Sequence, residues 1–95
     1  MKGPFQLDIP PHVAERIRKL PPEVKQGLKE ALRLLSRDPG AGEPLRRDLE
    51  GYWKYRVRRY RVVYQRVRGV VRVVGVGHRR TIYEELAERL RSETN

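Results

Sequence analysis

Cationic and apolar side chains alternate over residues 53–58, where the chain reads WKYRVR. Successive residues of a β-strand point to opposite faces, so this spacing predicts one face that carries Lys54, Arg56 and Arg58. Arg61 follows in a second alternating run, and Arg79 lies just beyond a third run that is rich in valine. We expect these side chains to form a phosphate-binding groove, because guanidinium groups make paired hydrogen bonds to phosphate oxygens.

The chain has 95 residues and a net charge of +10, and that charge is concentrated in one segment. Residues 46–80 contain 12 basic and 2 acidic residues, whereas the two kinds balance in the rest of the chain. A single cation on a solvent-facing strand is usually a surface residue with no ligand. A cluster is different, because like charges on neighbouring strands repel each other until a polyanion binds. We therefore interpret the cluster, rather than any one residue, as a polyanion-binding surface.

Several kinds of site are excluded or weakened by the residues that are missing. The sequence has no cysteine, no GxxxxGK[ST] phosphate loop and no HExxH zinc motif. Its two histidines, His12 and His78, and its few hydroxyl side chains do not suggest a Ser-His-Asp triad. We expect no metal and no other cofactor.

RNA cleavage remains open, because it needs no nucleophile from the protein. The 2′-hydroxyl of the RNA can attack the adjacent phosphate, while the protein moves two protons and stabilises the charged phosphorane. Arginines suit the stabilising role. Lys54 is the only lysine among residues 46–80, and neighbouring cations would favour its neutral form, which could act as a base. Tyr83 could offer a ring on which an RNA base stacks.

The elements that must position these residues follow from hydrophobic periodicity. We expect a strand at 5–9, two helices near 11–20 and 22–36 joined by Pro21-Pro22, a loop from 38, three strands within 53–76, and a helix after Thr81. The predicted fold class is α+β: one small domain over residues 1–95, with an N-terminal strand and a helical hairpin packed on an antiparallel or mixed sheet, and a short C-terminal helix. We expect the helices to cover one face of the sheet.

We expect neither a membrane-spanning segment nor a secretory leader. No stretch approaches the roughly 18 apolar residues that span a bilayer, and the first residues, MKGPF, lack the apolar core of a secretory leader. We expect a cytoplasmic protein.

Three motifs in a fixed order resemble the RelE/ParE toxin superfamily, and its RelE branch most closely. They are LEGYWKYRV at residues 49–57, YRVVY at 60–64, and VGHRR at 76–80 followed by Tyr83. The helix pair also fits, so the resemblance covers nearly the whole chain. It implies a toxin of a type II toxin–antitoxin system that cleaves messenger RNA in the ribosomal A site, without a metal, and thereby inhibits translation.

The resemblance also implies roles for particular residues. Lys54 or Arg56 would help to activate the 2′-hydroxyl, Arg61 would stabilise the phosphorane, and Arg79 would act as general acid or charge stabiliser. Tyr83 would stack on the substrate base. Arginine hardly deprotonates, so Arg56 is a poor base and the role shifts toward Lys54 or toward electrostatic catalysis alone. Further RNA contacts are expected from Arg58, Arg59, His78 and Arg80.

Partners and alternatives follow from the same resemblance. The implied partners are messenger RNA, the ribosome with its RNA, and a small antitoxin protein that covers the basic groove or displaces the terminal helix in a hetero-oligomer. A ParE-like inhibitor of DNA gyrase is an alternative, although such chains usually lack the full set of cations and the terminal tyrosine. A non-catalytic RNA-binding module is another.

Overall fold

A computed structural model describes residues 5–94 of the chain. The expectation about a secretory leader rests largely on residues 1–4, which lie outside this described part. The elements are β1 (Gln6–Asp8), α1 (Pro11–Arg18), α2 (Pro22–Arg37), the 3₁₀ turn η1 (Pro39–Ala41), β2 (Glu43–Pro44), the 3₁₀ turn η2 (Arg47–Leu49), β3 (Trp53–Val57), β4 (Tyr60–Val67), β5 (Val70–His78) and α3 (Ile82–Thr94). None of these helices is long and apolar enough to cross a membrane.

The five strands form one mixed sheet in the order β1-β5-β4-β3-β2. Strand β1 runs parallel to β5, and the other neighbouring strands are antiparallel. The α+β class with a helical hairpin and a terminal helix is therefore confirmed. Strand β2 and the two 3₁₀ turns were not predicted, because segments of two or three residues are too short to show a hydrophobic period.

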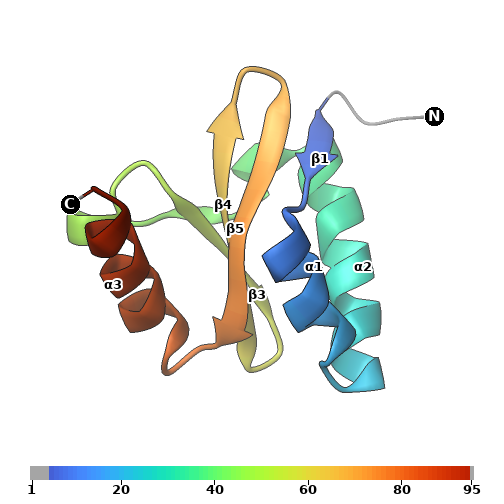
Figure 1. Cartoon of the computed structure of the whole chain (residues 1–95). Coiled ribbons are helices and arrows are strands. Elements are labelled where there is room, and N and C mark those ends of the chain that lie inside the picture. The colour runs from blue at the N-terminus through green and yellow to red at the C-terminus, as the bar shows by residue number, and fades with distance from the viewer. Residues whose placement is uncertain (1–4, 95) are drawn as a thin grey trace.

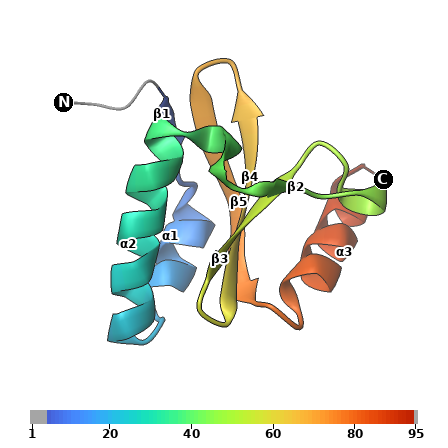
Figure 2. The same ribbon diagram turned by 180° about the vertical axis from the view of Figure 1, so that it is seen from behind.

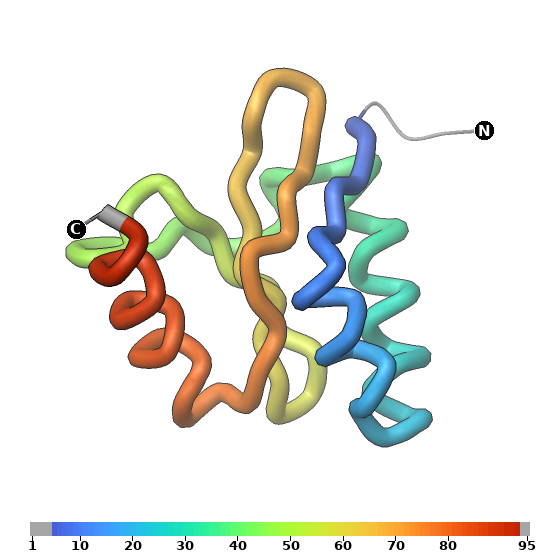
Figure 3. Tube along the Cα trace, viewed as in Figure 1, coloured from blue at the N-terminus to red at the C-terminus, as the bar shows by residue number. Residues whose placement is uncertain are grey.

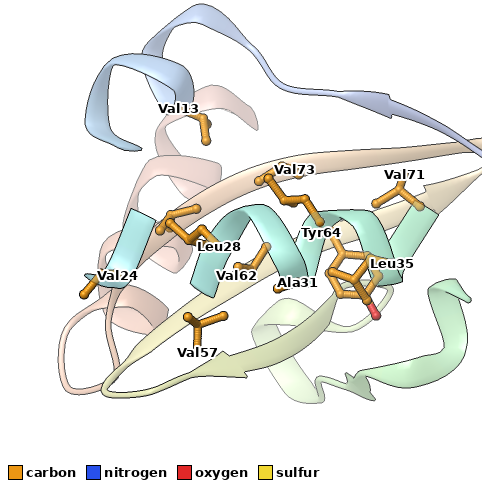
Figure 4. Close-up of a cluster of buried hydrophobic side chains, with 12 residues drawn as sticks. Val13, Val24, Leu28, Ala31, Leu35, Val57, Val62, Tyr64, Val71 and Val73 are labelled. Carbon is orange, nitrogen blue, oxygen red and sulfur yellow. The ribbon is translucent and has the colours of Figure 1, made fainter. Parts of the chain in front are cut away.

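Helices cover both faces of the sheet, so the expectation that they share one face is wrong. Figures 1 and 2 show α1 and α2 on one side of the strands and α3 on the other. Two separate groups of buried side chains match this arrangement. The larger one, drawn in Figure 4, joins α1 and α2 to the sheet through residues such as Leu28, Leu35 and Val62. The smaller one consists of Leu49, Val63, Ile82 and Leu86.

An irregularity between β4 and β5 determines which residues of the valine-rich strand face which helices. Val63 pairs with Gly75 and Tyr64 pairs with Val73, so Val74 has no partner in the register. A bulge of this kind changes the alternation of side chains along the strand. Val74 and Gly75 therefore both face the smaller core, while Val73 and Val76 on either side of them belong to the larger one.

Helix α3 is seated on β5 by two glycines beyond this bulge. A Cβ atom at Gly75 would lie 3.0 Å from Leu86, and one at Gly77 would lie 2.9 Å from Ile82. The absence of these side chains lets α3 approach the strand closely. The guanidinium of Arg89 also donates a hydrogen bond to the Val74 carbonyl. The trace in Figure 3 shows the β4–β5 hairpin passing between α3 and the α1/α2 pair.

Candidate functional site

The register of β3 and β4 places three of the predicted cations on the face covered by α3. Lys54 is opposite Val63 and Arg56 is opposite Arg61, and Val63 belongs to the smaller core beneath α3. Trp53 and the other alternate residues of β3 pack toward the larger core on the opposite face. The predicted separation of cationic and apolar faces is confirmed for Lys54, Arg56 and Arg61. The expectation that Arg58 shares this strand face is wrong, because β3 ends at Val57 and Arg58 lies in the turn that follows.

These cations surround a hollow of about 360 Å³. We call it the Lys54 hollow, and it is lined by Gly42, Glu43, Lys54, Tyr55, Arg56 and Arg61. Tyr83 on α3 adjoins it, because the Lys54 ammonium lies 5.7 Å from the centre of the Tyr83 ring. Two sheet strands and the C-terminal helix therefore bring together Lys54, Arg56, Arg61 and Tyr83.

Glu43 is a component of the hollow that the sequence pattern did not indicate. It lies directly opposite Lys54 in the β2–β3 register, with 3.8 Å between its Oε1 atom and the Lys54 ammonium. Its side chain is 77% exposed and so accessible to a ligand. Glu43 precedes the basic segment of residues 46–80, so the charge distribution does not point to it. Its position before Pro44 was a usable indication, since a residue preceding proline favours an extended backbone.

Close packing at Gly42 fixes the position of Glu43. A Cβ atom at Gly42 would collide with the carbonyl oxygen of Lys54 and with the hydroxyl of Tyr64. Tyr64 is fully buried and donates a hydrogen bond of 2.7 Å to the Pro39 carbonyl. Burial raises the pKa of Tyr64 above its ordinary value of 10.0, so the hydroxyl remains a donor at neutral pH. The loop before β2 is thereby held against the sheet.

The Arg61 guanidinium is held by the tight β3–β4 hairpin. Its Nη1 atom donates to the Tyr60 carbonyl at 2.9 Å and to the Arg58 carbonyl at 3.1 Å. Arg58 has a φ of 56°, the left-handed conformation of a two-residue turn. Because a guanidinium has five N–H groups, those not used here remain for a phosphate in the hollow.

Tyr83 places its ring at the hollow and its hydroxyl in the interior. The hydroxyl oxygen is buried without a hydrogen bond of good geometry. Desolvation raises the pKa of Tyr83 above 10.0, and the neighbouring Arg61 cation opposes that rise. The side chain is therefore neutral near pH 7, and its aromatic ring is the part that can contact a ligand.

Four further arginines lie in two adjacent turns at one end of the sheet rather than in the lining of the Lys54 hollow. Arg58 and Arg59 form the β3–β4 turn, and Arg79 and Arg80 form the turn between β5 and α3. The Arg79 amide donates to the Arg59 carbonyl at 2.8 Å, which holds the two turns side by side. All four side chains are exposed.

His78 lies on the opposite side of the sheet from the Lys54 hollow. It is paired with Tyr60, and its ring meets the Tyr60 ring edge-on with 5.8 Å between centres. Together with His12 of α1 it lines a separate hollow of about 520 Å³. Its Nδ1 atom accepts a hydrogen bond of 3.2 Å from the Arg80 amide. The structure therefore does not bring His78 to the predicted catalytic residues.

Comparison with known proteins gives a consistent family assignment. Residues 8–83 match the family described as the ParE toxin of the type II toxin–antitoxin system parDE. A search of curated proteins found no match.

Solved structures of several bacterial toxins are similar to this chain. The Escherichia coli toxin RelE, solved in the free state as a mutant, is 30% identical with a TM-score of 0.70, and the similarity covers 90% of this chain and 96% of that one. The toxin–antitoxin complex RelBE2 from Mycobacterium tuberculosis is also 30% identical, with a TM-score of 0.71 over 80% of this chain and 92% of that one. The YoeB–YefM complex from Staphylococcus aureus shares the fold at 18% identity, with a TM-score of 0.65 over 78% and 95% of the two chains.

The family match spans most of the chain, and the two relatives at 30% identity cover most of its length. This chain belongs to the RelE/ParE superfamily and is a RelE-like toxin of a type II toxin–antitoxin system.

Proposed function

We propose that this toxin is an endoribonuclease that cleaves messenger RNA in the ribosomal A site and so stops translation. The observation that carries the proposal is the convergence of three cations, one carboxylate and one tyrosine ring at a single hollow. A phosphate could bind there between the guanidinium groups of Arg56 and Arg61. The proposal needs no metal, because the RNA supplies its own nucleophile.

The reaction would be attack of the 2′-hydroxyl oxygen on the adjacent phosphorus. The new P–O2′ bond forms, the P–O5′ bond breaks, and the products are a 2′,3′-cyclic phosphate and a 5′-hydroxyl. One proton leaves the 2′-hydroxyl and another reaches the departing O5′. Arg56 and Arg61 would stabilise the negative charge that accumulates on the phosphorane oxygens.

The ion pair between Glu43 and Lys54 suggests how those protons are moved. The pair places a carboxylate oxygen, which can accept a proton, next to an ammonium group, which can donate one, in the same hollow. We therefore assign proton removal from the 2′-hydroxyl to Glu43. Donation of a proton to O5′ is assigned to Lys54. Arg79, which was expected to supply this proton or to stabilise charge, is the alternative residue for the same step. Tyr83 would hold the base beside the cleaved bond by stacking.

The proposed partners are the ribosome, messenger RNA and a cognate antitoxin. The four exposed arginines of the two adjacent turns would contact ribosomal RNA through its phosphates. Two of the similar structures are toxin–antitoxin complexes, which supports an antitoxin that binds this chain. The cytoplasm, where ribosomes work, is the corresponding location.

Mapping of messenger RNA ends in a cell-free translation reaction tests the proposed activity. Addition of the toxin should produce new 5′ ends within translated codons, and omission of ribosomes should abolish them. Arg61→Ala and Glu43→Gln should each reduce the cleavage rate about 100-fold or more, in line with the loss of a charge stabiliser or a proton acceptor. The matched control Arg33→Ala removes an exposed cation from α2 and should cleave normally. Intact messenger RNA with arrested synthesis would contradict the proposal.

Inhibition of DNA gyrase is a second candidate, because the matched family is that of ParE toxins. A supercoiling assay with purified gyrase separates the two functions. Loss of supercoiling at toxin concentrations that leave messenger RNA intact would favour the gyrase function. Cleavage without an effect on supercoiling would favour the endoribonuclease.

A further inference from the structure

A second hollow is lined by Tyr83, whose ring also adjoins the Lys54 hollow. It has a volume of about 410 Å³ and is formed by residues 46–49, which include the η2 turn, and by one side of α3 from Tyr83 to Arg91. We call it the Arg46 hollow, after the first of its lining residues. Its lining includes Arg46, Arg47 and Arg91 against two carboxylates, Asp48 and Glu84. The exposed guanidinium groups of Arg46 and Arg47 are suited to an anionic ligand.

Tyr83 connects the two hollows. It lines the Arg46 hollow directly, and its ring centre is 5.7 Å from the Lys54 ammonium of the first hollow. Arg61 and Glu43, which line the first hollow, both act electrostatically on its hydroxyl. A ligand that stacks on this ring would therefore adjoin both hollows.

Arg46 and Arg47 are available for such a ligand. Both are exposed, and neither lies within ion-pair distance of a carboxylate among residues 5–94. Arg47 has a φ of 59°, a conformation that costs free energy for a residue with a side chain. Unusual backbone conformations of this kind often occur where a side chain is held for binding.

We propose that the Arg46 hollow is a subsite for the nucleotide next to the one bound at the Lys54 hollow. The ligand is single-stranded RNA, whose base contacts Tyr83 while the neighbouring phosphate is bound by Arg46 and Arg47. This inference rests on the proposed function and adds a binding site to it. An acidic peptide could also neutralise two arginines, but the aromatic ring that adjoins both hollows favours a ligand with alternating phosphates and flat bases.

Binding of short oligonucleotides tests the subsite on the full-length toxin. The probes are fluorescein-labelled RNAs. In each of them the nucleotide whose 2′-hydroxyl would attack the cleaved phosphate is a 2′-deoxynucleotide, which prevents cleavage. One probe is a dinucleotide, and two others extend it by one nucleotide on the 5′ or the 3′ side. The wild-type toxin should bind one of the extended probes roughly tenfold more tightly than the dinucleotide, because a charge-assisted phosphate contact is added.

The double variant Arg46→Gln, Arg47→Gln should lose that gain and leave dinucleotide binding close to that of a control. The control, Arg33→Gln with Arg37→Gln, removes the same charge from exposed positions of α2. The slope of log affinity against log salt for the favoured extended probe should also become shallower by about 0.7 for each phosphate that the variant no longer neutralises.

Three results would overturn the subsite. The Arg46/Arg47 variant could weaken all three probes equally, it could match the control, or the wild-type toxin could gain nothing from either extension. The proposed function is judged separately by cleavage in translation. A toxin that shows the predicted binding but leaves messenger RNA intact would retain the subsite and lose the endoribonuclease assignment.

Discussion

Addition of a single methyl group at Gly42 should destabilise the fold and disturb the site together. The new Cβ atom would collide with the Lys54 carbonyl and the Tyr64 hydroxyl, neither of which is the free end of a flexible side chain. Overpacking of this kind costs about 1–3 kcal/mol. Loss of the buried hydrogen bond from Tyr64 to the Pro39 carbonyl adds about 1 kcal/mol.

The expected loss in the free energy of unfolding for Gly42→Ala is therefore about 2–4 kcal/mol. Domains of this size lose about 4–8 °C of melting temperature for each kcal/mol, so the midpoint should fall by roughly 8–32 °C. Chemical denaturation monitored by tryptophan fluorescence measures the change, since Trp53 packs against the larger core. Cleavage should fall by about 10- to 100-fold even where the variant is folded, because Glu43 and Lys54 are displaced from each other.

Gly40→Ala is the matched control in the same loop. Its Cβ atom would lie 3.6 Å from Asp38 Oδ1 and 3.9 Å from the Arg66 guanidinium, which are ordinary contacts. Its stability should change by less than about 1 kcal/mol. A Gly42→Ala variant as stable as this control would refute the packing argument. Tyr64→Phe offers a second check, because removal of the hydroxyl should relieve part of the collision and make the double variant less destabilised than the sum of the single ones.

Three further predictions concern α3, the β4–β5 turn and alkaline pH. Leu86→Ala should lower the free energy of unfolding by about 2–5 kcal/mol, since Leu86 is 1% exposed in the smaller core; a urea titration with a change below about 1 kcal/mol would contradict it. Gly69→Ala should cost about 1–2 kcal/mol in the same assay, because Gly69 has a φ of 78° and follows Arg68 at 38°; an unchanged midpoint would exclude strain at this turn. Burial raises the pKa of both Tyr83 and Tyr64, so the unfolded chain releases these protons first as the pH rises above 10. Stability should be unaffected by these groups below pH 10 and should fall above it, and Tyr83→Phe should make that fall shallower in denaturation curves collected at several pH values.

The strand pairing that builds the site could be predicted from alternation alone. Once Trp53 and Tyr55 are assigned to the core, Lys54 and Arg56 must share the other face, and a two-residue turn brings Arg61 opposite Arg56. That inference needs only the period of a strand and the shortness of the hairpin. It depends on no long-range information.

The remaining features depend on contacts that no local pattern reports. The apolar stripe of α3 indicates that this helix packs against another element. Which face of the sheet it covers depends on Gly75 and Gly77, which lie beyond the bulge in β5. His78 is assigned to the face opposite Arg61 only by pairing with Tyr60. Glu43 is placed opposite Lys54 by β2, a strand of two residues. A strand this short shows no alternation of apolar and polar residues from which it could be predicted.

The division of the interior into two cores has a consequence for motion. Most of the apolar side chains bind α1 and α2 to the sheet, whereas α3 and Tyr83 depend mainly on the smaller group around Leu86. A segment with fewer buried contacts opens at a lower free energy than the whole molecule. We expect the amide hydrogens of α3 to exchange with solvent while those of β4 and β5 remain protected. The toxin can thus release one wall of its candidate site without unfolding the sheet that carries the cations.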